Sequence, residues 1–271
     1  MINSKLLTYF DVQFCLCLYC IENKKPMNTF VIIPSRLSAT RLPGKPLLKI
    51  NGLSIISHVF KNAQKANIGE VIVATEDQEI VDDVKQNGGQ VILTKNTHKT
   101  GTDRIYEALQ KIDNSNIDLV MNLQGDEPLM NVEDIRNLHN QMIKNESGLG
   151  TLASIITKKK IFKDQNIVKV MTKKNLDTNN FPEAINFMRK VDEQNENIYH
   201  HLGIYCYKKE VLKSFISLNQ SSNEIKNRLE QLRALDNDIV VNVALAKFSP
   251  IGVDTEEDFV AIKKIMEYKL K

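Results

Sequence analysis

The chain has 271 residues, of which 25% are charged and 42% hydrophobic, as is usual for a water-soluble globular protein that can bury a full core. Its net charge of +3 is too close to neutral to predict nucleic-acid binding from the overall electrostatic field. Trp is absent, and no block of Arg and Lys with interleaved aromatic residues occurs, so we expect no nucleic-acid partner.

The first 26 residues differ in character from the rest of the chain. Leu6 to Ile21 is apolar and aromatic, but Asp11 and Gln13 interrupt it, and a membrane-spanning helix needs ~20 apolar residues. The stretch has no clear small-residue cleavage site, which argues against a signal peptide. Met27 precedes the first predicted strand by three residues. We therefore expect residues 1–26 to be an extension outside the fold. We also expect the protein to be cytoplasmic, without stable membrane insertion.

The cysteines are concentrated in this extension. Cys15, Cys17 and Cys20 lie close together, and Cys206 is alone in the rest of the chain. This usage fits a reducing compartment and argues against a disulfide framework. The three could bind a metal, but no second cluster completes a set of four ligands, so we interpret them as ordinary apolar residues.

Strand-like and helix-like segments alternate after Met27. Apolar runs predict strands over 30–33, 70–74, 90–93 and 118–123. Helical spacing and helix-start or helix-stop signals predict helices over 53–66, 77–87 and 102–112. The alternation predicts an α/β fold with a mainly parallel sheet and helices on both faces. Ligands of such sheets bind beyond the carboxyl ends of the strands, so we expect function in the loops that follow them.

The second half of the chain is less regular. We predict strands over 151–157, 166–172, 184–188, 201–207 and 239–246, and helices over 208–216, 223–235 and 255–268. The charged run Lys158–Lys160 is interpreted as a solvated turn. Residues 27–271 are expected to form one domain, in which the antiparallel segment at about 157–207 is a subdomain or an oligomer-forming arm.

The loop after the first strand carries three cations. Arg36, Arg41 and Lys45 lie among small residues after Pro34. Arg binds phosphate oxygens bidentately and Lys acts as a point charge, so the loop predicts a site for a polyanion such as a nucleoside triphosphate. The Walker loop and the Gly-rich dinucleotide fingerprint are both absent. An ordinary charged surface loop is the alternative.

Two acids are candidate metal ligands. Asp126 follows the fourth predicted strand, and Asp254 precedes the terminal helix. Mg²⁺ commonly takes one or two protein carboxylates together with substrate phosphates, so this pair with a triphosphate loop predicts a Mg²⁺ site. The alternatives are a turn at Asp126 and a helix N-cap at Asp254.

Seven motifs from Met27 to the C-terminus resemble the family of 3-deoxy-manno-octulosonate (Kdo) cytidylyltransferases, the CMP-Kdo synthetases. In the family's order they are PSRLSATRLPGKPL at 34–47, VATED at 73–77, THKTGTDR at 97–104, NLQGDEP at 122–128, HLGIY at 201–205, LEQLRAL at 229–235 and GVDTEED at 252–258. Sialic-acid cytidylyltransferases share the arrangement of strands and loops but characteristically have a different first loop.

The resemblance implies a Rossmann-like nucleotidyltransferase fold that makes CMP-Kdo and pyrophosphate from CTP and Kdo with Mg²⁺, for lipopolysaccharide biosynthesis, in a homodimer. Carried over by position, the catalytic residues are Arg36, Lys45, Asp126 and Asp254, the last two as metal ligands. The implied CTP-binding residues are Arg36, Lys45, Ala74, Thr75, Gly101, Arg104 and Gln124. Those implied to face the acidic 2-keto sugar are Arg41, Arg189, His201, Tyr205, Glu230 and Gln231.

Simpler interpretations exist for the sugar-side residues. His201 and Tyr205 can be packed core residues, and Glu230 and Gln231 can face solvent from the helix predicted there. The segment 173–200 is shorter than is usual for the family, and Met188 stands where Ser is common. This departure keeps open a related acid such as 8-amino-Kdo as the substrate. A non-catalytic nucleotide-binding protein on the same fold is a separate alternative, against which the intact Arg36, Lys45, Asp126 and Asp254 argue.

Overall fold

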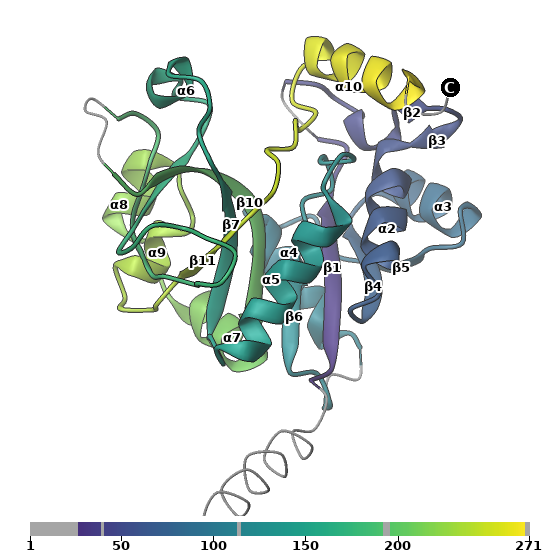
Figure 1. Ribbon diagram of the computed structural model, residues 1–271. Coiled ribbons are helices and arrows are strands. Elements are labelled where there is room, and N and C mark those ends of the chain that lie inside the picture. Colours follow the sequence, from purple (N-terminus) through teal and green to yellow (C-terminus); the bar gives the residue numbers. More distant parts are fainter. Residues whose placement is uncertain (1–26, 39–40, 113–114, 192–195, 269–271) are drawn as a thin grey trace, which may run out of the picture.

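The computed structural model describes residues 27–38, 41–112, 115–191 and 196–268 (Figure 1). The extension of residues 1–26, including Cys15, Cys17 and Cys20, lies outside the described residues, so its predicted separation from the fold stays a prediction. Within the described ranges, no helix combines the length and apolar character needed to cross a bilayer.

A mixed sheet of nine strands forms the centre of the molecule. Its main path runs in the order β11 (Asn242–Leu245), β7 (Leu149–Ser154), β10 (Ile198–Lys208), β6 (Leu119–Asn122), β1 (Thr29–Ser35), β4 (Glu70–Thr75) and β5 (Gln90–Leu93). The pairs β1·β4, β1·β6, β4·β5 and β7·β11 are parallel, whereas β10 runs antiparallel to β6 and β7. The predicted mainly parallel sheet is therefore confirmed.

Strands β8 (Lys169–Thr172) and β9 (Ala184–Met188) extend this sheet at one end of β10. Strand β8 pairs antiparallel with both β10 and β9. A separate two-stranded hairpin, β2 (Lys49–Ile50) with β3 (Leu53–Ser54), follows a single 3-10 turn, η1 (Lys45–Leu47). The antiparallel pairing lies in the region expected to form an arm, but the division into domains and the arm's role in assembly stay predictions.

Helices cover both faces of the sheet because the central strand is apolar on both sides. Val31 and Ile33 of β1 pack with α2 (Ile55–Ala66) and α5 (Val132–Lys144). Ile32 packs on the opposite face with α4 (Gly101–Gln110) and α7 (Lys209–Ser217). An unbroken apolar run is the pattern expected of a parallel strand buried on both faces. Figure 1 shows α2 and α5 together over one face of the strands.

The remaining helices are α3 (Gln78–Gln86), α6 (Lys160–Lys163), α8 (Ser222–Asn227), α9 (Leu232–Leu235) and α10 (Glu256–Tyr268). Ile262 of α10 and Val253 before it pack on Ile50 and Ile55 in a third, smaller core cluster. The C-terminal segment is thereby fixed beside the hairpin that follows the cationic loop, as Figure 1 shows for α10, β2 and β3.

One expectation about helices was wrong, and one helix was not predicted. The segment 223–235 is not one helix, because α8 ends at Asn227, the following Arg228 is left-handed with φ of 54° and ψ of 50°, and α9 begins only at Leu232. Helix α5 was not predicted, although Asn131 caps it and Ile135, Leu138 and Met142 supply a buried stripe. Lys158–Lys160 is exposed as expected of a solvated run, although Lys160 begins the short helix α6.

Candidate active site

A cavity of about 380 Å³ lies at the carboxyl ends of β1 and β6, where the predicted loops meet. The predicted site residues that line it are Arg36, Arg41, Lys45, Gly101, Arg104, Gln124, Asp126 and Asp254. These residues come from four separate parts of the chain. His98, Lys99 and Thr100 line the cavity as well, and none of the three was predicted as a site residue.

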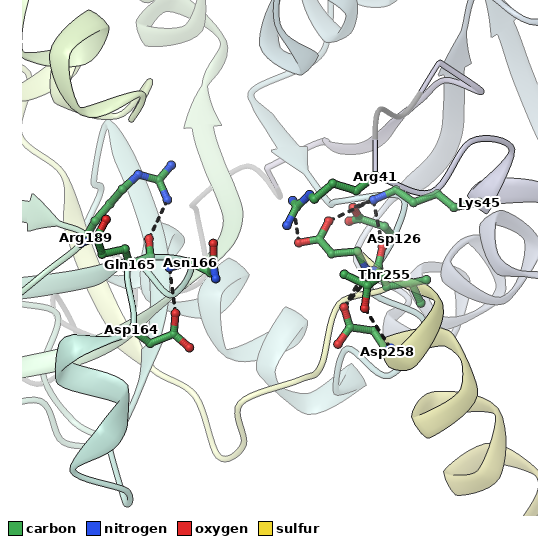
Figure 2. Close-up of polar contacts among 11 residues, drawn as sticks. Arg41, Lys45, Asp126, Asp164, Gln165, Asn166, Arg189, Thr255 and Asp258 are labelled. Carbon is green, nitrogen blue, oxygen red and sulfur yellow. Dashed lines mark hydrogen bonds and ion pairs between the residues drawn. The ribbon is translucent and has the colours of Figure 1, made fainter.

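Lys45 lies between the two candidate metal ligands. Its Nζ donates to Asp126 Oδ2 at 2.5 Å and to Asp254 Oδ1 at 3.3 Å. It also donates to the backbone oxygen of Val253 at 2.9 Å. Arg41 reaches the other oxygen of Asp254, with Nη2 to Oδ2 at 2.9 Å (Figure 2). Two cations of the first loop therefore contact the two acids that the sequence pointed to.

The local backbone explains how Lys45 reaches this position. Gly44 precedes η1 with φ at +70°, a left-handed conformation that glycine adopts without strain. Its N–H donates to the oxygen of Leu37 at 3.0 Å, which closes the loop. Pro46 is the second residue of the 3-10 turn and is buried. The sequence LPGKP thus turns the chain sharply and directs Lys45 into the cavity.

Asp254 is not the cap of the terminal helix. Thr255 and Asp258 perform that function, with Thr255 N–H donating to Asp258 Oδ2 at 3.0 Å and Asp258 N–H donating to Thr255 Oγ1 at 3.2 Å (Figure 2). The Asp254 carboxylate is therefore available to Lys45 and Arg41. The N-cap alternative for Asp254 is wrong, because the neighbouring residue supplies the cap.

Asp126 and Asp254 form an acidic corner of the cavity that fits a divalent cation. Asp126 and Asp254 each place an oxygen within 3.3 Å of the same Lys45 nitrogen, so both oxygens can serve one ion. Two carboxylates completed by substrate phosphates are a usual Mg²⁺ environment. Within the described residues, no cluster of three or more His, Cys, Asp or Glu side chains forms a metal site made of protein ligands alone. A metal at Asp126 and Asp254 would thus need ligands from substrate or water.

Glu127 is a further carboxyl group at this corner, beside Asp126 and Asp254, that the sequence did not single out. Burial, followed by the negative charges of Asp126 and Asp254, raises the pKa of Glu127 to about 8. Its Oε2 is inaccessible and has no hydrogen-bond partner. Because burial is the largest cause of this rise, Glu127 is mostly protonated at neutral pH, and the negative charge that would attract a cation comes from Asp126 and Asp254.

Of the other residues implied to bind CTP, some line the cavity and some do not. Gln124 faces the cavity and its Nε2 donates to the oxygen of Gly203 at 3.0 Å. Arg104 also lines the cavity, but it is 3% exposed, pairs with Glu76 and donates to Thr94 Oγ1 at 2.8 Å. Ala74 and Thr75 are fully buried in β4 and are not among the residues that line the cavity.

His201 and Tyr205 belong to a row of rings along β10. The His201 ring lies 5.0 Å from Phe187 and 5.5 Å from Tyr205, and Tyr207 continues the row 6.1 Å beyond Tyr205. His201 Nε2 is 3.0 Å from Thr151 Oγ1. The histidine is therefore packed and hydrogen-bonded, so the simple core interpretation describes its present contacts.

His201 makes the stability of the protein dependent on pH. Burial lowers the pKa of His201 from 6.5 to about 3, so the folded protein keeps this ring neutral while the unfolded chain binds a proton below about pH 6.5. Unfolding is therefore favoured as the pH falls from 6.5 towards 3. We expect His201 to remove about 2 kcal/mol from the free energy of unfolding between about pH 7 and about pH 5.

Urea unfolding of the wild type and of His201→Gln at both pH values measures this effect. The variant is expected to lose about 2 kcal/mol less than the wild type on acidification. An equal loss in both proteins would show that His201 does not account for the pH dependence.

Glu230 and Gln231 lie between α8 and α9 rather than on a helix. Thr102 Oγ1 donates to Glu230 Oε2 at 2.6 Å, and Gln231 is 8% exposed. The expectation that these two residues could face solvent from one continuous helix is wrong, because the left-handed Arg228 breaks the chain direction before them.

Arg189 lies at a second cavity, of about 720 Å³, which shares Arg41 with the first. Its guanidinium donates to three backbone oxygens, those of Asn227 and Arg228 at 3.0 Å and of Gln165 at 3.1 Å. Figure 2 shows Arg189 and Gln165 on the opposite side from Arg41 and Lys45. The implied role of Arg189 in sugar binding stays a prediction, because its guanidinium donates its hydrogen bonds to backbone oxygens in this structure.

Comparison with known proteins adds independent information. A family model described as "Cytidylyltransferase" matches residues 30–244. A 3-deoxy-manno-octulosonate cytidylyltransferase from Thermodesulfovibrio yellowstonii is 41% identical over 251 residues, which cover 89% of this chain and 98% of the relative. One from Bartonella tribocorum is 37% identical over 242 residues, covering 89% of this chain and 99% of the relative.

Solved structures agree with these relatives. A CMP:2-keto-3-deoxy-manno-octonic acid synthetase complexed with CTP superposes with a TM-score of 0.81 at 32% identity, and the match covers 89% of this chain and 99% of that one. A 4-diphosphocytidyl-2C-methyl-D-erythritol synthase from Anaerococcus prevotii has a TM-score of 0.60 at 14% identity, covering 90% of this chain and 100% of the other. The second likeness shows the shared fold alone.

Proposed function

Because this chain belongs to the 3-deoxy-manno-octulosonate cytidylyltransferase family, we propose that it transfers CMP from CTP to the anomeric hydroxyl of Kdo and releases pyrophosphate. The observation that carries the proposal is the cavity in which Arg36, Lys45, Asp126 and Asp254 converge. Cations that bind phosphates and carboxylates suited to a metal are the two components that nucleotidyl transfer needs. The relative solved with CTP supports the choice of nucleotide.

Asp126 and Asp254 would hold Mg²⁺, which when bound neutralises charge on the α-phosphate and the leaving pyrophosphate. Arg36 and Lys45 would bind the triphosphate oxygens in the same cavity, with Lys99 as a further cation in its wall. Their charges orient the α-phosphorus for in-line attack and stabilise the negative charge that develops on the leaving group. Gln124 and Gly101 line the same cavity and would face the nucleoside.

Arg41 would bind the carboxylate of the acidic sugar. It lines both cavities, so its guanidinium lies where the nucleotide side meets the sugar side. The present partner of Arg41 is the carboxylate of Asp254. The Arg41 side chain is 60% exposed. A substrate carboxylate would replace Asp254 as the partner of Arg41 if Asp254 served as a metal ligand. The sugar hydroxyl then bonds to the α-phosphorus as the bond to the bridging β-phosphate oxygen breaks.

We also propose a cytoplasmic homodimer that supplies CMP-Kdo for lipopolysaccharide biosynthesis. The family's activity supports this setting, because a CTP-dependent activation step needs a compartment that contains nucleoside triphosphates. Light scattering coupled to size-exclusion chromatography measures the oligomeric state.

A substrate panel tests the proposed reaction. Purified protein is incubated with each nucleoside triphosphate, with and without Mg²⁺, against Kdo, 8-amino-Kdo and a sialic acid, and pyrophosphate release is measured. We expect release only where CTP, Kdo and Mg²⁺ are present together. Faster turnover of 8-amino-Kdo would change the assigned sugar. CTP binding without any turnover by folded protein would instead support a non-catalytic nucleotide-binding role.

A further inference from the structure

Thr102 links the nucleotide-side cavity to the predicted sugar-side residues. It is the second residue of α4 and is 1% exposed. The two residues before it, Thr100 and Gly101, line the cavity. Its own hydroxyl donates to Glu230 Oε2 at 2.6 Å, across 128 positions of sequence. The first turn of α4 therefore lines the nucleotide-side cavity and also contacts Glu230, one of the residues implied to face the sugar.

The position of this turn is closely constrained. Thr100 caps α4, its Oγ1 accepting from Asp103 N–H at 3.1 Å, while Asp103 Oδ2 accepts from Thr100 N–H at 3.1 Å. A Cβ added at Gly101 would lie 3.3 Å from Cγ of Pro34, tighter than ordinary van der Waals contact. The start of α4 is thus held by a capping box and by close packing on the end of β1.

Glu230 has one oxygen that is bonded and one that is not. Oε2 accepts from Thr102, whereas Oε1 is inaccessible and has no hydrogen-bond partner. The nearest cation, Nη2 of Arg233, is 3.8 Å from Oε1. Arg233 is already engaged by Glu224, with Nε and Nη2 donating at 2.8 and 2.6 Å. Oε1 is thus an acceptor without a donor.

An unpaired buried acceptor is costly, and a ligand that supplies a donor removes that cost. The Glu230 side chain is 28% exposed although Oε1 itself is inaccessible, so a ligand hydroxyl reaches Oε1 only when the side chains around it shift. Burial raises the pKa of Glu230, and the hydrogen bond from Thr102 is the largest contribution that opposes this rise. A hydroxyl group can donate a hydrogen bond to a carboxylate without carrying a charge of its own.

We propose that Thr102 is a positioning residue that holds Glu230 by one oxygen, so that the other can accept from a hydroxyl of a polyhydroxylated acid. This proposal rests on the proposed function, because the acid is the sugar that accepts CMP. Since Thr100 and Gly101 belong to the same turn, the contact also fixes the distance between the sugar hydroxyls and the nucleotide. Thr102 is not among the residues that line the nucleotide-side cavity, and its hydroxyl donates to Glu230, so we expect it to act through Glu230.

Thr102→Val is the direct test, because it removes the hydroxyl and keeps the branched shape. We expect the KM for Kdo to rise about 10- to 100-fold, the range for a lost hydrogen bond to a charged group, while the Kd for CTP measured by calorimetry changes less than about twofold. Thr102→Ser keeps the hydroxyl and is expected to stay within about threefold of the wild type for both constants.

Thr29→Val is the matched control. Thr29 is equally buried at 1% and hydrogen-bonds through its hydroxyl to His139 at 2.9 Å, but it lies at the amino end of β1, away from the cavity. The control is expected to leave both substrate constants unchanged. A general loss of packing would affect both Thr→Val variants, whereas a positioning role affects only Thr102→Val.

A double-mutant cycle with Glu230→Ala shows whether Thr102 acts through Glu230. If it does, adding Thr102→Val to Glu230→Ala raises the KM for Kdo by less than about twofold further. The inference would be overturned if the two substitutions raised the KM for Kdo multiplicatively. It would also be overturned if Thr102→Val left this KM unchanged or if Thr102→Ser did not restore it. The proposed function would stand in each case. A wild-type protein that shows no turnover would overturn both.

Discussion

Asp126→Asn is expected to lower kcat by on the order of a thousandfold or more, because a preorganised charge at the reacting phosphate is among the largest single contributions to catalysis. Asn has the same shape and retains an oxygen that can accept from Lys45, which now donates to Asp126 at 2.5 Å. The substitution therefore removes charge with little change in packing. What is lost is half of the carboxylate pair that would bind Mg²⁺.

Pyrophosphate release under saturating CTP and Kdo measures the effect, and thermal unfolding checks that the variant is folded. Asp118→Asn is the matched control, since Asp118 precedes the amino end of the same strand and accepts from Asn28 N–H at 2.8 Å. The control is expected to retain wild-type turnover. If Asp126→Asn were folded and fully active, Asp126 would not be a metal ligand and the assigned site would be wrong.

Lys45→Ala is expected to weaken CTP handling much more than Kdo handling. Lys45 is 14% exposed, and its Nζ is the cation between Asp126 and Asp254 at the base of the cavity. Its removal takes away a phosphate ligand in a partly buried site, where electrostatic interactions are stronger than in water. We expect kcat/KM for CTP to fall by on the order of a hundredfold, with the KM for Kdo changing less than about threefold.

The same variant has a second expected result that does not depend on turnover. Without Lys45, Asp126, Asp254 and the buried Glu127 lose their shared cation, so Mg²⁺ should raise Tm more in Lys45→Ala than in the wild type. Lys49→Ala, an exposed lysine outside the cavity, is the control and should behave as the wild type in both assays. A larger effect on Kdo than on CTP would refute the assigned role of Lys45.

Much of the fold could be predicted because its signals are local. The apolar run 30–33 and the strand 90–93 carry their pattern within a few residues, and the structure places strands there. Helix α5 carried the same kind of signal in Ile135, Leu138 and Met142. The break before Glu230 could not be predicted in this way, because Arg228 is neither Gly nor Asn, the residues that usually mark a left-handed position.

The candidate site could be predicted only as a set of loops. Parallel strands bring their carboxyl ends to one edge, so a cationic loop after the first strand and an acid after a later one are expected to meet. That rule placed Lys45 and Asp126 in one cavity although they are 81 positions apart. It did not place Ala74 and Thr75, which end their strand at the same edge but are covered by neighbouring chain.

The sequence by itself therefore determined most of the strands and helices, the cationic loop and the motifs that show the family, but not α5 or the break between α8 and α9. Only the tertiary structure decided that Lys45 lies between the two acids, that Glu127 is enclosed beside them, and that Thr102 bonds to Glu230. Strand and helix patterns depend on neighbours within about one turn, whereas these contacts join segments whose separation depends on how the whole sheet packs. Burial and charge at the site are properties of that packing.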